Sequence, residues 1–474
     1  MALVAGIDSS TQSCKVVVRD LVSGVAIREG RAPHPVGTEV DPESWWRALI
    51  SALEDAGGID DVCALSIAAQ QHGMVVLDRD GKVIRPALLW NDVRSAGASE
   101  ELVKNFGRTA LVERTGSVPV ASFTATKLRW LLDNEPDSAT QVAAVALPHD
   151  WLTWRLLGYG PRGTTRLGPD LSALTTDRSD ASGTLYWSPE KGTYDEEILS
   201  WSLGHVPIVP RVLEPGESAG ATVRGVDPVV PEGIIVGGGA GDNAAAAMGL
   251  GASLGDVVIS IGTSGTVFAV NEKAVADQSG TVCGFADATG HYLPLVATLN
   301  AARILDVVAE ILGVGHVDLG RLAQNATPGS GGLVLQPYFE GERTPNLPYA
   351  TATLFGMTLT STTRSNLARA AIEGLLCGLA DGVDALRSVG VEPQRILLIG
   401  GASSNAAVVE IASQVFDLPI TVPKRDEYVA NGAARQAGWA YLGCPVEWSL
   451  DVFANVDSDY QPLIRQQYGR HRIG

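Results

Sequence analysis

The sequence has few cysteines, and they form no pattern typical of a metal site or a redox pair. Cys14, Cys63, Cys283, Cys377 and Cys444 are an odd number and lie far apart, with no CxxC pair and no histidine at metal-ligand spacing. Scattered cysteines of this kind are typical of a reducing compartment. We therefore expect a cytoplasmic protein.

The sequence also has no long apolar run and no excess of positive charge, and we expect no leader. No uninterrupted apolar stretch approaches the roughly 18 residues of a membrane span, and the apolar start at Leu3–Ile7 has no basic segment before it. The 35 Lys and Arg residues face 53 Asp and Glu residues, for a net charge of −18. These features argue against a membrane or nucleic acid as a partner.

The length and composition indicate a folded chain of more than one domain. Single domains run to roughly 100 to 200 residues, and this chain has 474, of which 45% are hydrophobic and 19% charged. We expect two large domains, with a boundary near residues 245–255. A cleft between two such domains is a natural place for a site.

A strand, polar turn and returning strand occur twice, at residues 3–18 and 256–270. Units of strand, glycine turn and helix follow at 234–247 and 395–416, and residues 367–386 have the periodicity of a long helix. This order predicts an α/β fold built from two related halves. Residues 162–187 have little periodicity and predict an exposed excursion or a pair of short strands.

The turns of both hairpins are rich in glycine, serine and threonine, which can bind phosphate through backbone N–H groups and hydroxyls. One such turn alone is better explained by a tight hairpin that needs glycine. Two of them, with a later Gly400-Gly401 turn, favour phosphate binding. The sequence contains no Walker-type GxxxxGK[ST] and no complete GxGxxG.

Three charged residues stand where such a site would need them. Asp8 follows a buried strand and could hold water around a magnesium ion, although an Asx-turn explains it too. Lys15 is either a phosphate contact or a solvated lysine. Asp242 stands where a glycine turn meets a helix, either as an N-cap or as a base whose ionised form the helix N-terminus favours.

Polar and aromatic residues at two further segments suit a polyhydroxylated ligand. Gln71 and His72 follow the apolar strand at residues 64–69, and Trp90 stands beside polar residues in 91–94. A structural histidine and a core tryptophan are the alternatives.

The chain resembles the FGGY family of carbohydrate kinases over nearly its full length. The resemblance rests on these segments: residues 6–12 with Lys15, 71–73, 89–92 with Arg94, 123–128, 147–150, 179–183, 239–243, 261–265, 341–345 and 400–405. It implies an α/β fold of two actin-like (ribonuclease H-like) lobes with a cleft between them. Residues 1–248 would form the N-terminal sugar-binding lobe and residues 249–474 the C-terminal ATP-binding lobe.

The resemblance also implies a role for each site residue. Asp242 would be the catalytic base, with Asp8 as a second catalytic residue that holds Mg²⁺ through water. The implied sugar contacts are Gln71, His72, Trp90, Asp242 and Asn243. The implied ATP contacts are Thr11, Gln12, Lys15, Gly262, Thr263, Ser264, Gly400, Gly401, Ala402 and Asn405.

The implied reaction is the transfer of a phosphoryl group from ATP to D-xylulose, giving D-xylulose 5-phosphate. Gln71 stands where relatives often have methionine, and His149 where lysine is frequent, so ribulose, a pentitol, glycerol or gluconate stays open as the acceptor. An actin- or Hsp70-like ATPase without a sugar substrate is the alternative from another class. The sequence leaves a homodimer open.

Overall fold

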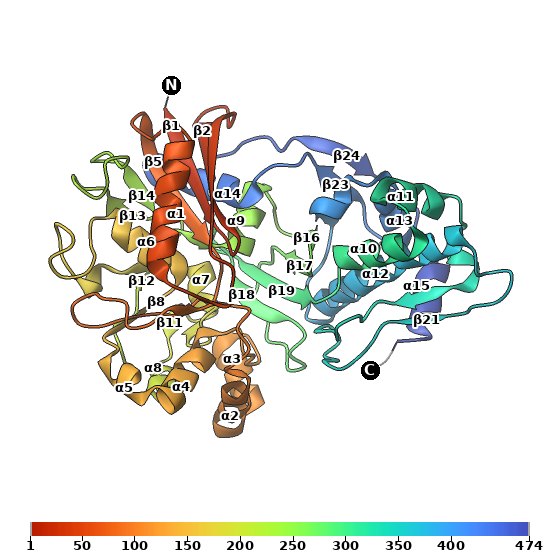
Figure 1. Ribbon diagram of the computed structural model, residues 1–474, viewed down its shortest axis with the longest axis horizontal. Helices are drawn as coiled ribbons and strands as arrows, with labels where there is room; N and C mark the ends of the chain where they lie inside the picture. The colour runs from red at the N-terminus through yellow and green to blue at the C-terminus, as the bar shows by residue number, and fades with distance from the viewer. Residues whose placement is uncertain (1, 473–474) are drawn as a thin grey trace. The chain divides into compact units, whose positions relative to one another are not determined.

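The computed structural model describes residues 2–472 and divides into two compact units, and many of their elements are labelled in Figure 1. The first unit comprises the chain up to Gly251 together with Gly284–Leu293 and Glu427–Ser449. The second comprises Ala252–Cys283, Pro294–Asp426 and the chain from Leu450 onward. Two segments from the later part of the chain therefore group with the first unit.

The sheet of the first unit contains the predicted N-terminal hairpin. Its strands are ordered β13 (Ser218–Ala221), β14 (Ile235–Gly237), β5 (Val62–Ala69), β1 (Leu3–Ser9), β2 (Ser13–Asp20) and β3 (Ala26–Pro33), with β15 (Ala240–Gly241) also paired to β5. β1 is antiparallel to β2 and parallel to β5, and β5 is parallel to β14. The hairpin prediction at residues 3–18 is confirmed.

A second seven-stranded sheet repeats this plan. Its strands are ordered β18 (Cys283–Ala286), β19 (Tyr292–Thr298), β17 (Gly265–Ala269), β16 (Asp256–Ile261), β22 (Arg395–Ile399), β23 (Ile420–Pro423) and β24 (Val452–Val456). β16 is antiparallel to β17 and parallel to β22, as β1 is to β2 and β5. The predicted second hairpin and the two related α/β halves are confirmed.

Short strand pairs and helices complete each unit. The pairs of the first unit are β4 (Glu39–Val40) with β7 (Ala87–Leu88), β6 (Val75–Leu77) with β8 (Ala144–Ala146), β9 (Thr175–Asp177) with β12 (Arg211–Leu213), and β10 (Trp187–Ser188) with β11 (Thr193–Tyr194). Its helices are α1 (Pro42–Asp55), α2 (Ala96–Phe106), α3 (Arg108–Thr115), α4 (Thr124–Asn134), α5 (Pro136–Gln141), α6 (Pro148–Leu156), α7 (Arg178–Ser182), α8 (Glu196–Leu203), α9 (Asp242–Gly249) and α14 (Tyr428–Leu442), with the 3-10 turn η1 (Leu171–Ala173). The second unit has β20 (Val334–Gln336) with β21 (Thr353–Phe355), the helices α10 (Ala302–Leu312), α11 (His316–Gln324), α12 (Arg364–Ser388), α13 (Ala406–Val415) and α15 (Pro462–Gly469), and the turns η2 (Ser330–Gly332) and η3 (Gly401–Ser404).

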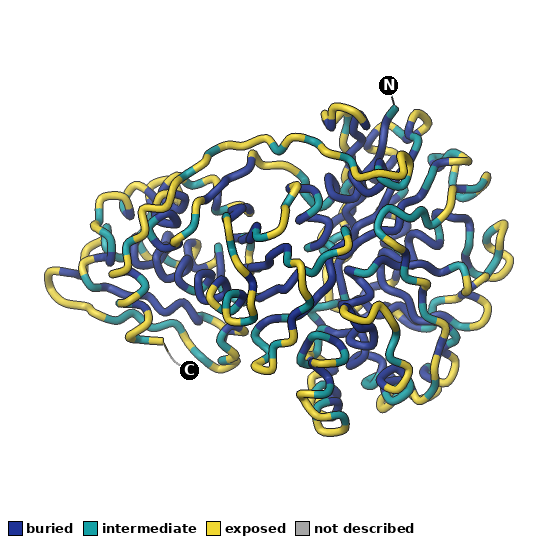
Figure 2. The backbone as a smooth tube through the Cα atoms, turned by 180° about the vertical axis from the view of Figure 1, so that it is seen from behind, coloured by how far each residue is buried: buried dark blue, intermediate teal, exposed yellow. Residues whose placement is uncertain are grey.

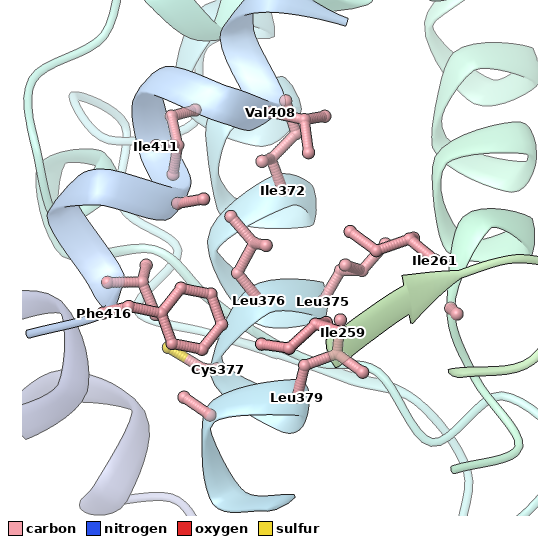
Figure 3. Close-up of a cluster of buried hydrophobic side chains, with 14 of the residues drawn as sticks. Ile259, Ile261, Ile372, Leu375, Leu376, Cys377, Leu379, Val408, Ile411 and Phe416 are labelled. Carbon is pink, nitrogen blue, oxygen red and sulfur yellow. The ribbon is translucent and has the colours of Figure 1, made fainter. Parts of the chain in front are cut away.

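The core of the second unit forms where helices cover its sheet. Ile259 and Ile261 on β16 lie in one buried cluster with Leu375 and Leu379 on α12 and Ile411 on α13 (Figure 3). Burial of such side chains stabilises the fold by roughly 1.5 to 3 kcal/mol each. The residues of the central strands are mostly buried, and the exposed residues gather in the connecting segments (Figure 2). Within residues 2–472, no helix combines the length and apolarity needed to cross a membrane.

Glycines allow α14 to lie unusually close to β1 and α9. A Cβ on Gly6 of β1 would lie 1.8 Å from the backbone oxygen of Ala430 on α14. A Cβ on Gly432 of α14 would meet the Ala245 oxygen at 1.8 Å, and one on Gly249 would meet the Tyr428 oxygen at 1.9 Å. The close approach of α14 to α9 also explains the run of alanines in α9, because only small side chains fit between the two helices. The packing fixes the helix whose first residue is Asp242.

The segment at residues 162–187 is more ordered than the sequence predicts. Most of residues 162–170 are exposed or half-buried, but residues 174–187 are almost entirely buried, within β9, α7 and the start of β10. The prediction of an exposed excursion is wrong for this second part. Its polar residues are buried because Asp177 accepts backbone N–H bonds from Ser179 and Asp180, which no periodicity signals.

Candidate active site

Asp8 lies near the end of β1, opposite Lys15 on β2. The two residues are cross-strand partners in the sheet, and the Lys15 Nζ lies 3.3 Å from the Asp8 carboxylate and 2.6 Å from that of Glu427. The Ser10 hydroxyl also donates to Asp8. Burial raises the pKa of Asp8, while Lys15 and Ser10 act in the opposite direction. Lys15 therefore offsets part of the charge on two carboxylates.

Asp242 is the first residue of α9, and Gly241 is the N-cap. The backbone N–H and the side-chain amide of Asn243 donate to the same Asp242 oxygen, at 2.8 and 2.9 Å. Asp242 as a whole is half-buried. Desolvation, and after it the negative charge of Asp8, raise the pKa of Asp242 to about 7.

The prediction that the helix N-terminus keeps Asp242 ionised is therefore wrong near and below neutral pH. The hydrogen bonds from the helix start do favour the charged form, but desolvation and Asp8 outweigh them. A carboxylate whose pKa lies close to neutral is well matched to accepting a proton from an alcohol.

Gln71 supports the turn that presents Asp242. Its side chain is buried, its amide donates to the Ser179 carbonyl at 3.2 Å, and a Cβ on Gly241 would lie 2.6 Å from its side-chain carbon. The Ser179 hydroxyl in turn accepts from the Gly241 N–H at 3.0 Å. Gln71 therefore orders the turn before Asp242, and its role as a sugar contact stays a prediction.

A buried charged cluster lies against the same turn. The His149 ring nitrogens face two different carboxylates, with Nδ1 at 2.6 Å from Asp180 and Nε2 at 3.2 Å from Asp150. A Cβ on Gly239 would lie 2.1 Å from the His149 ring. Burial favours the neutral ring, but Asp150, Asp180 and Asp177 overcome it and raise the pKa of His149 to about 10.

His149, Asp150 and Asp180 are residue types that bind metals, and their ligand atoms lie within 4.8 Å of one another. However, Nδ1 hydrogen-bonds the Asp180 carboxylate, and Nε2 lies 3.2 Å from the Asp150 carboxylate without the geometry of a hydrogen bond. The charges of the nearby carboxylates favour a protonated His149, whose positive charge offsets theirs.

Trp90, which is expected at the sugar, contacts Thr11, which is expected at the phosphates. The Trp90 indole donates to the Thr11 hydroxyl at 2.9 Å, and this hydroxyl lies 3.5 Å from the Gln70 side-chain oxygen. Trp90 and Thr11 are half-buried, and Gln12 is exposed. The side chain of Trp90 is thus oriented by a polar contact rather than packed fully into the core.

His72 has a left-handed backbone, with φ of 68°, which is rare for a residue other than glycine. Its Nδ1 lies 2.6 Å from the Gly183 carbonyl and its ring packs edge-on against Phe123 at 5.1 Å. A carbonyl can only accept, so Nδ1 carries a proton and Nε2 is the acceptor of the neutral ring.

In the second unit, the two glycine turns expected at the nucleotide lie next to each other. A Cβ on Gly400, which has φ of 98°, would lie 2.4 Å from the oxygen of Ile261, the residue before Gly262. Thr263, Ser264 and Gly401 are exposed, and Gly262 and Ala402 are half-buried. Backbone groups and two hydroxyls are thus accessible in one place.

Asn405 occupies the N-cap of α13. Its side-chain oxygen accepts from the Ala407 N–H at 3.0 Å, and its amide donates to the His316 carbonyl at 3.0 Å. Both ends of the side chain therefore have partners in the protein. A contact between Asn405 and adenosine stays a prediction.

Four residues next to these sites received no role from the sequence. They are Lys127, His149, Ser179 and Glu427. All but Glu427 stand in the segments that carry the family resemblance, and that is the signal which could have found them. Glu427 comes from a distant segment, and only the fold brings it to Lys15.

Family models agree with this geometry in both halves of the chain. The N-terminal domain of the FGGY family of carbohydrate kinases matches residues 3–249, and the C-terminal domain of the same family matches residues 257–441. The chain belongs to the FGGY family of carbohydrate kinases. Family membership confirms the expectation of a kinase with two actin-like lobes and decides against an ATPase that lacks a sugar substrate.

Individual relatives of this FGGY kinase match over nearly the whole chain. It is 42% identical over 499 residues to a xylulose kinase of Streptomyces rubiginosus, with 98% of both chains covered. It is 43% identical over 448 residues to a xylulose kinase of Streptomyces coelicolor, covering 93% of this chain and 88% of the relative. The crystal structure of a xylulose kinase from Bifidobacterium adolescentis has a TM-score of 0.93 at 44% identity, covering 100% of this chain and 99% of that one.

Proposed function

We propose that this chain transfers the γ-phosphoryl group of ATP to D-xylulose, forming D-xylulose 5-phosphate and ADP. The near full-length relatives named xylulose kinase support the sugar. The observation that carries the chemistry is Asp242, a half-buried residue at the start of α9 whose pKa is raised to about 7. The first unit binds the sugar in this proposal, and the second binds ATP.

In this mechanism Asp242 removes the proton from the sugar hydroxyl. The hydroxyl oxygen forms a bond to the γ-phosphorus as the bond to the leaving oxygen of ADP breaks, and the electron pair goes to ADP. Asn243 holds one oxygen of Asp242 through two hydrogen bonds, which leaves the second oxygen to accept the proton. His72 and Trp90 orient the sugar.

The residues around Asp8 fit a magnesium ion held through water. Mg²⁺ takes oxygen ligands and keeps several waters, and Asp8 provides a carboxylate that Lys15 and Ser10 already contact. The charge of Asp8 also raises the pKa of Asp242, so the two carboxylates act on each other electrostatically. When bound, Mg²⁺ supplies positive charge that offsets the charge on the phosphates.

A reducing compartment suits this chain. None of its five cysteines forms a disulfide, as expected for proteins of the cytoplasm. We therefore propose the cytoplasm as the place of the reaction.

Initial rates of ADP formation across a panel of acceptors test the proposed substrate. The panel is D-xylulose, D-ribulose, xylitol, glycerol and D-gluconate at saturating MgATP. We expect the highest kcat/KM with D-xylulose. A higher kcat/KM for another acceptor would replace the sugar and keep the kinase, whereas ADP formation that ignores every acceptor would reject the proposed reaction.

A further inference from the structure

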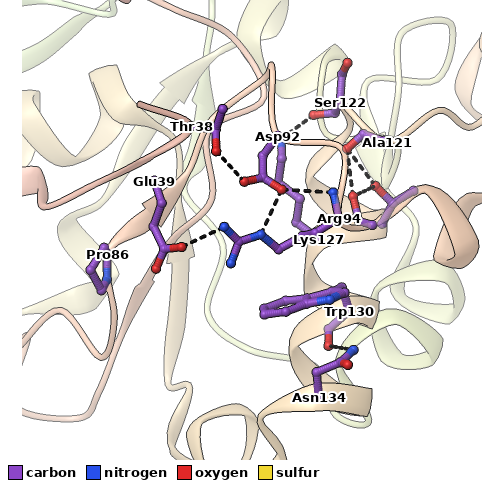
Figure 4. Close-up of polar contacts among 12 residues, drawn as sticks. Thr38, Glu39, Pro86, Asp92, Arg94, Ala121, Ser122, Lys127, Trp130 and Asn134 are labelled. Carbon is purple, nitrogen blue, oxygen red and sulfur yellow. Dashed lines mark hydrogen bonds and ion pairs between the residues drawn. The ribbon is translucent and has the colours of Figure 1, made fainter. Parts of the chain in front are cut away.

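Lys127 is a buried lysine at a position that disfavours positive charge. It lies in the first turn of α4, where the helix dipole is positive, and its side chain is fully buried. Burial lowers the pKa of Lys127 to about 7, and Asp92 opposes this effect. Among the described residues, no carboxylate lies within ion-pair distance of the Lys127 ammonium. The nearby carboxylate of Asp92 instead contacts the Arg94 guanidinium and the Thr38 hydroxyl (Figure 4).

The ammonium of Lys127 contacts backbone oxygens instead. It donates to the His72 carbonyl at 2.8 Å and to the Ser122 carbonyl. The Thr124 hydroxyl, three residues earlier on α4, donates to the same His72 carbonyl at 3.2 Å. Two side chains from one helix turn therefore converge on a single peptide oxygen.

That peptide belongs to the strained residue of the candidate site. A left-handed backbone at a residue other than glycine costs on the order of 1 to 3 kcal/mol and persists only where its surroundings hold it. The backbone of His72 is held through its carbonyl by Lys127 and Thr124, and its ring is held by Gly183 and Phe123.

We propose that Lys127 and Thr124 are positioning residues that hold the left-handed peptide of His72 and thereby aim its ring at the sugar. The proposal rests on the proposed function, in which His72 contacts the sugar. Loss of either donor lets the peptide relax to an ordinary conformation and moves the ring. The expected consequence is weaker sugar binding, with ATP binding and the chemical step largely preserved.

Lys127→Met and Thr124→Val test the proposal, with Thr124→Ser as the matched variant that keeps the hydroxyl. We expect Lys127→Met and Thr124→Val each to raise the KM for the sugar about tenfold, the loss of one hydrogen bond to a strained site. The KM for ATP and kcat should stay within about threefold, and Thr124→Ser should restore the sugar KM. An equal rise in both KM values, or a Thr124→Ser variant as poor as Thr124→Val, would overturn the proposal.

A double-mutant cycle with His72→Gly separates positioning from general stability. Glycine adopts φ of 68° without strain and has no ring to aim. In the His72→Gly background, Lys127→Met should therefore add less than about twofold to the sugar KM. A full additional tenfold effect there would show that Lys127 acts by another route.

Two choices in the design let this proposal be tested even if D-xylulose is not the substrate or if one variant does not fold. The assay uses whichever acceptor gives the unchanged protein its highest kcat/KM, so it holds if D-xylulose fails. Thr124→Val and Thr124→Ser decide the proposal if Lys127→Met does not fold. Calorimetric titration of the sugar without ATP provides a second reading of the same loss in affinity.

Discussion

The candidate ligand contacts of the two units differ in the kind of residue that provides them. The first unit surrounds its residues with buried ionisable groups, among them Asp8, Lys127 and His149. The charge of Asp8 raises the pKa of Asp242, and burial together with nearby carboxylates shifts the pKa values of Lys127 and His149. The second unit offers turns at residues 262–264 and 400–402 that are exposed or half-buried and consist of glycine, threonine, serine and alanine. Substitutions in the first unit should change charge and proton transfer, whereas those in the second should change backbone geometry.

The largest effect should come from Asp242→Asn. Asparagine keeps the size and loses the base, so we expect kcat to fall by on the order of 10³-fold or more, roughly 4 kcal/mol of barrier. Sugar-dependent ADP formation under saturating conditions measures it. Asp60→Asn, an exposed carboxylate of the same unit, is the control and should stay within about twofold. Full sugar-dependent turnover by Asp242→Asn would remove the base assignment.

The next effect concerns the stability of the buried cluster. His149→Gln leaves Asp150 and Asp180 without their cation, and removing one partner of a buried ion pair costs about 3 to 5 kcal/mol. Urea unfolding should report a loss of this size, and His149→Lys should recover much of it by restoring the charge. A His149→Gln protein within about 1 kcal/mol of the unchanged one would contradict the imidazolium.

The same cluster predicts a pH dependence of stability. His149 has a pKa of about 10 in the folded protein, against roughly 6.5 in an unfolded chain. Its contribution is therefore fully present below the unfolded value and is lost as pH rises through the folded one. The urea midpoint should fall between about pH 7 and pH 10, by more in the unchanged protein than in His149→Gln.

A smaller effect distinguishes two adjacent glycines of the second unit. Gly400 has φ of 98° and its Cβ would meet the Ile261 oxygen at 2.4 Å, whereas nothing lies within 4 Å of a Cβ on Gly401. Gly400→Ala should lower stability by about 1 to 3 kcal/mol and raise the KM for ATP. Gly401→Ala is the matched control and should leave the melting temperature unchanged. Equal melting temperatures for the two variants would show that the turn tolerates a side chain at residue 400.

Much of the fold could be predicted because strands and turns have local signatures. The hairpin at residues 3–18 and the helix after Asn405 follow from apolar periodicity, glycine and capping residues, and the structure has them there. The buried segment before Trp187 could not be found this way, because its polar residues are satisfied by local hydrogen bonds that periodicity does not reveal.

The candidate site was predictable in part for a related reason. Asp8 and Asp242 stand at strand and helix ends, where local sequence already indicates a role. The pKa of Asp242 and the contact of Lys15 with Glu427 depend on distant segments that only the folded chain brings together. The left-handed backbone of His72 has no sequence signal, since glycine is the residue expected there.

The pH dependence of kcat/KM for the sugar tests the central claim most directly. If Asp242 is the base, kcat/KM should fall about tenfold per pH unit below its pKa, which is about 7. Asp8→Asn removes the negative charge that raises this pKa, so its acidic limb should move to lower pH even though its overall rate is reduced. ADP should be quantified by chromatography after quenching, which avoids coupling enzymes with their own pH dependence. An acidic limb that stays at the same pH in Asp8→Asn, or none in the unchanged protein, would contradict Asp242 as the base.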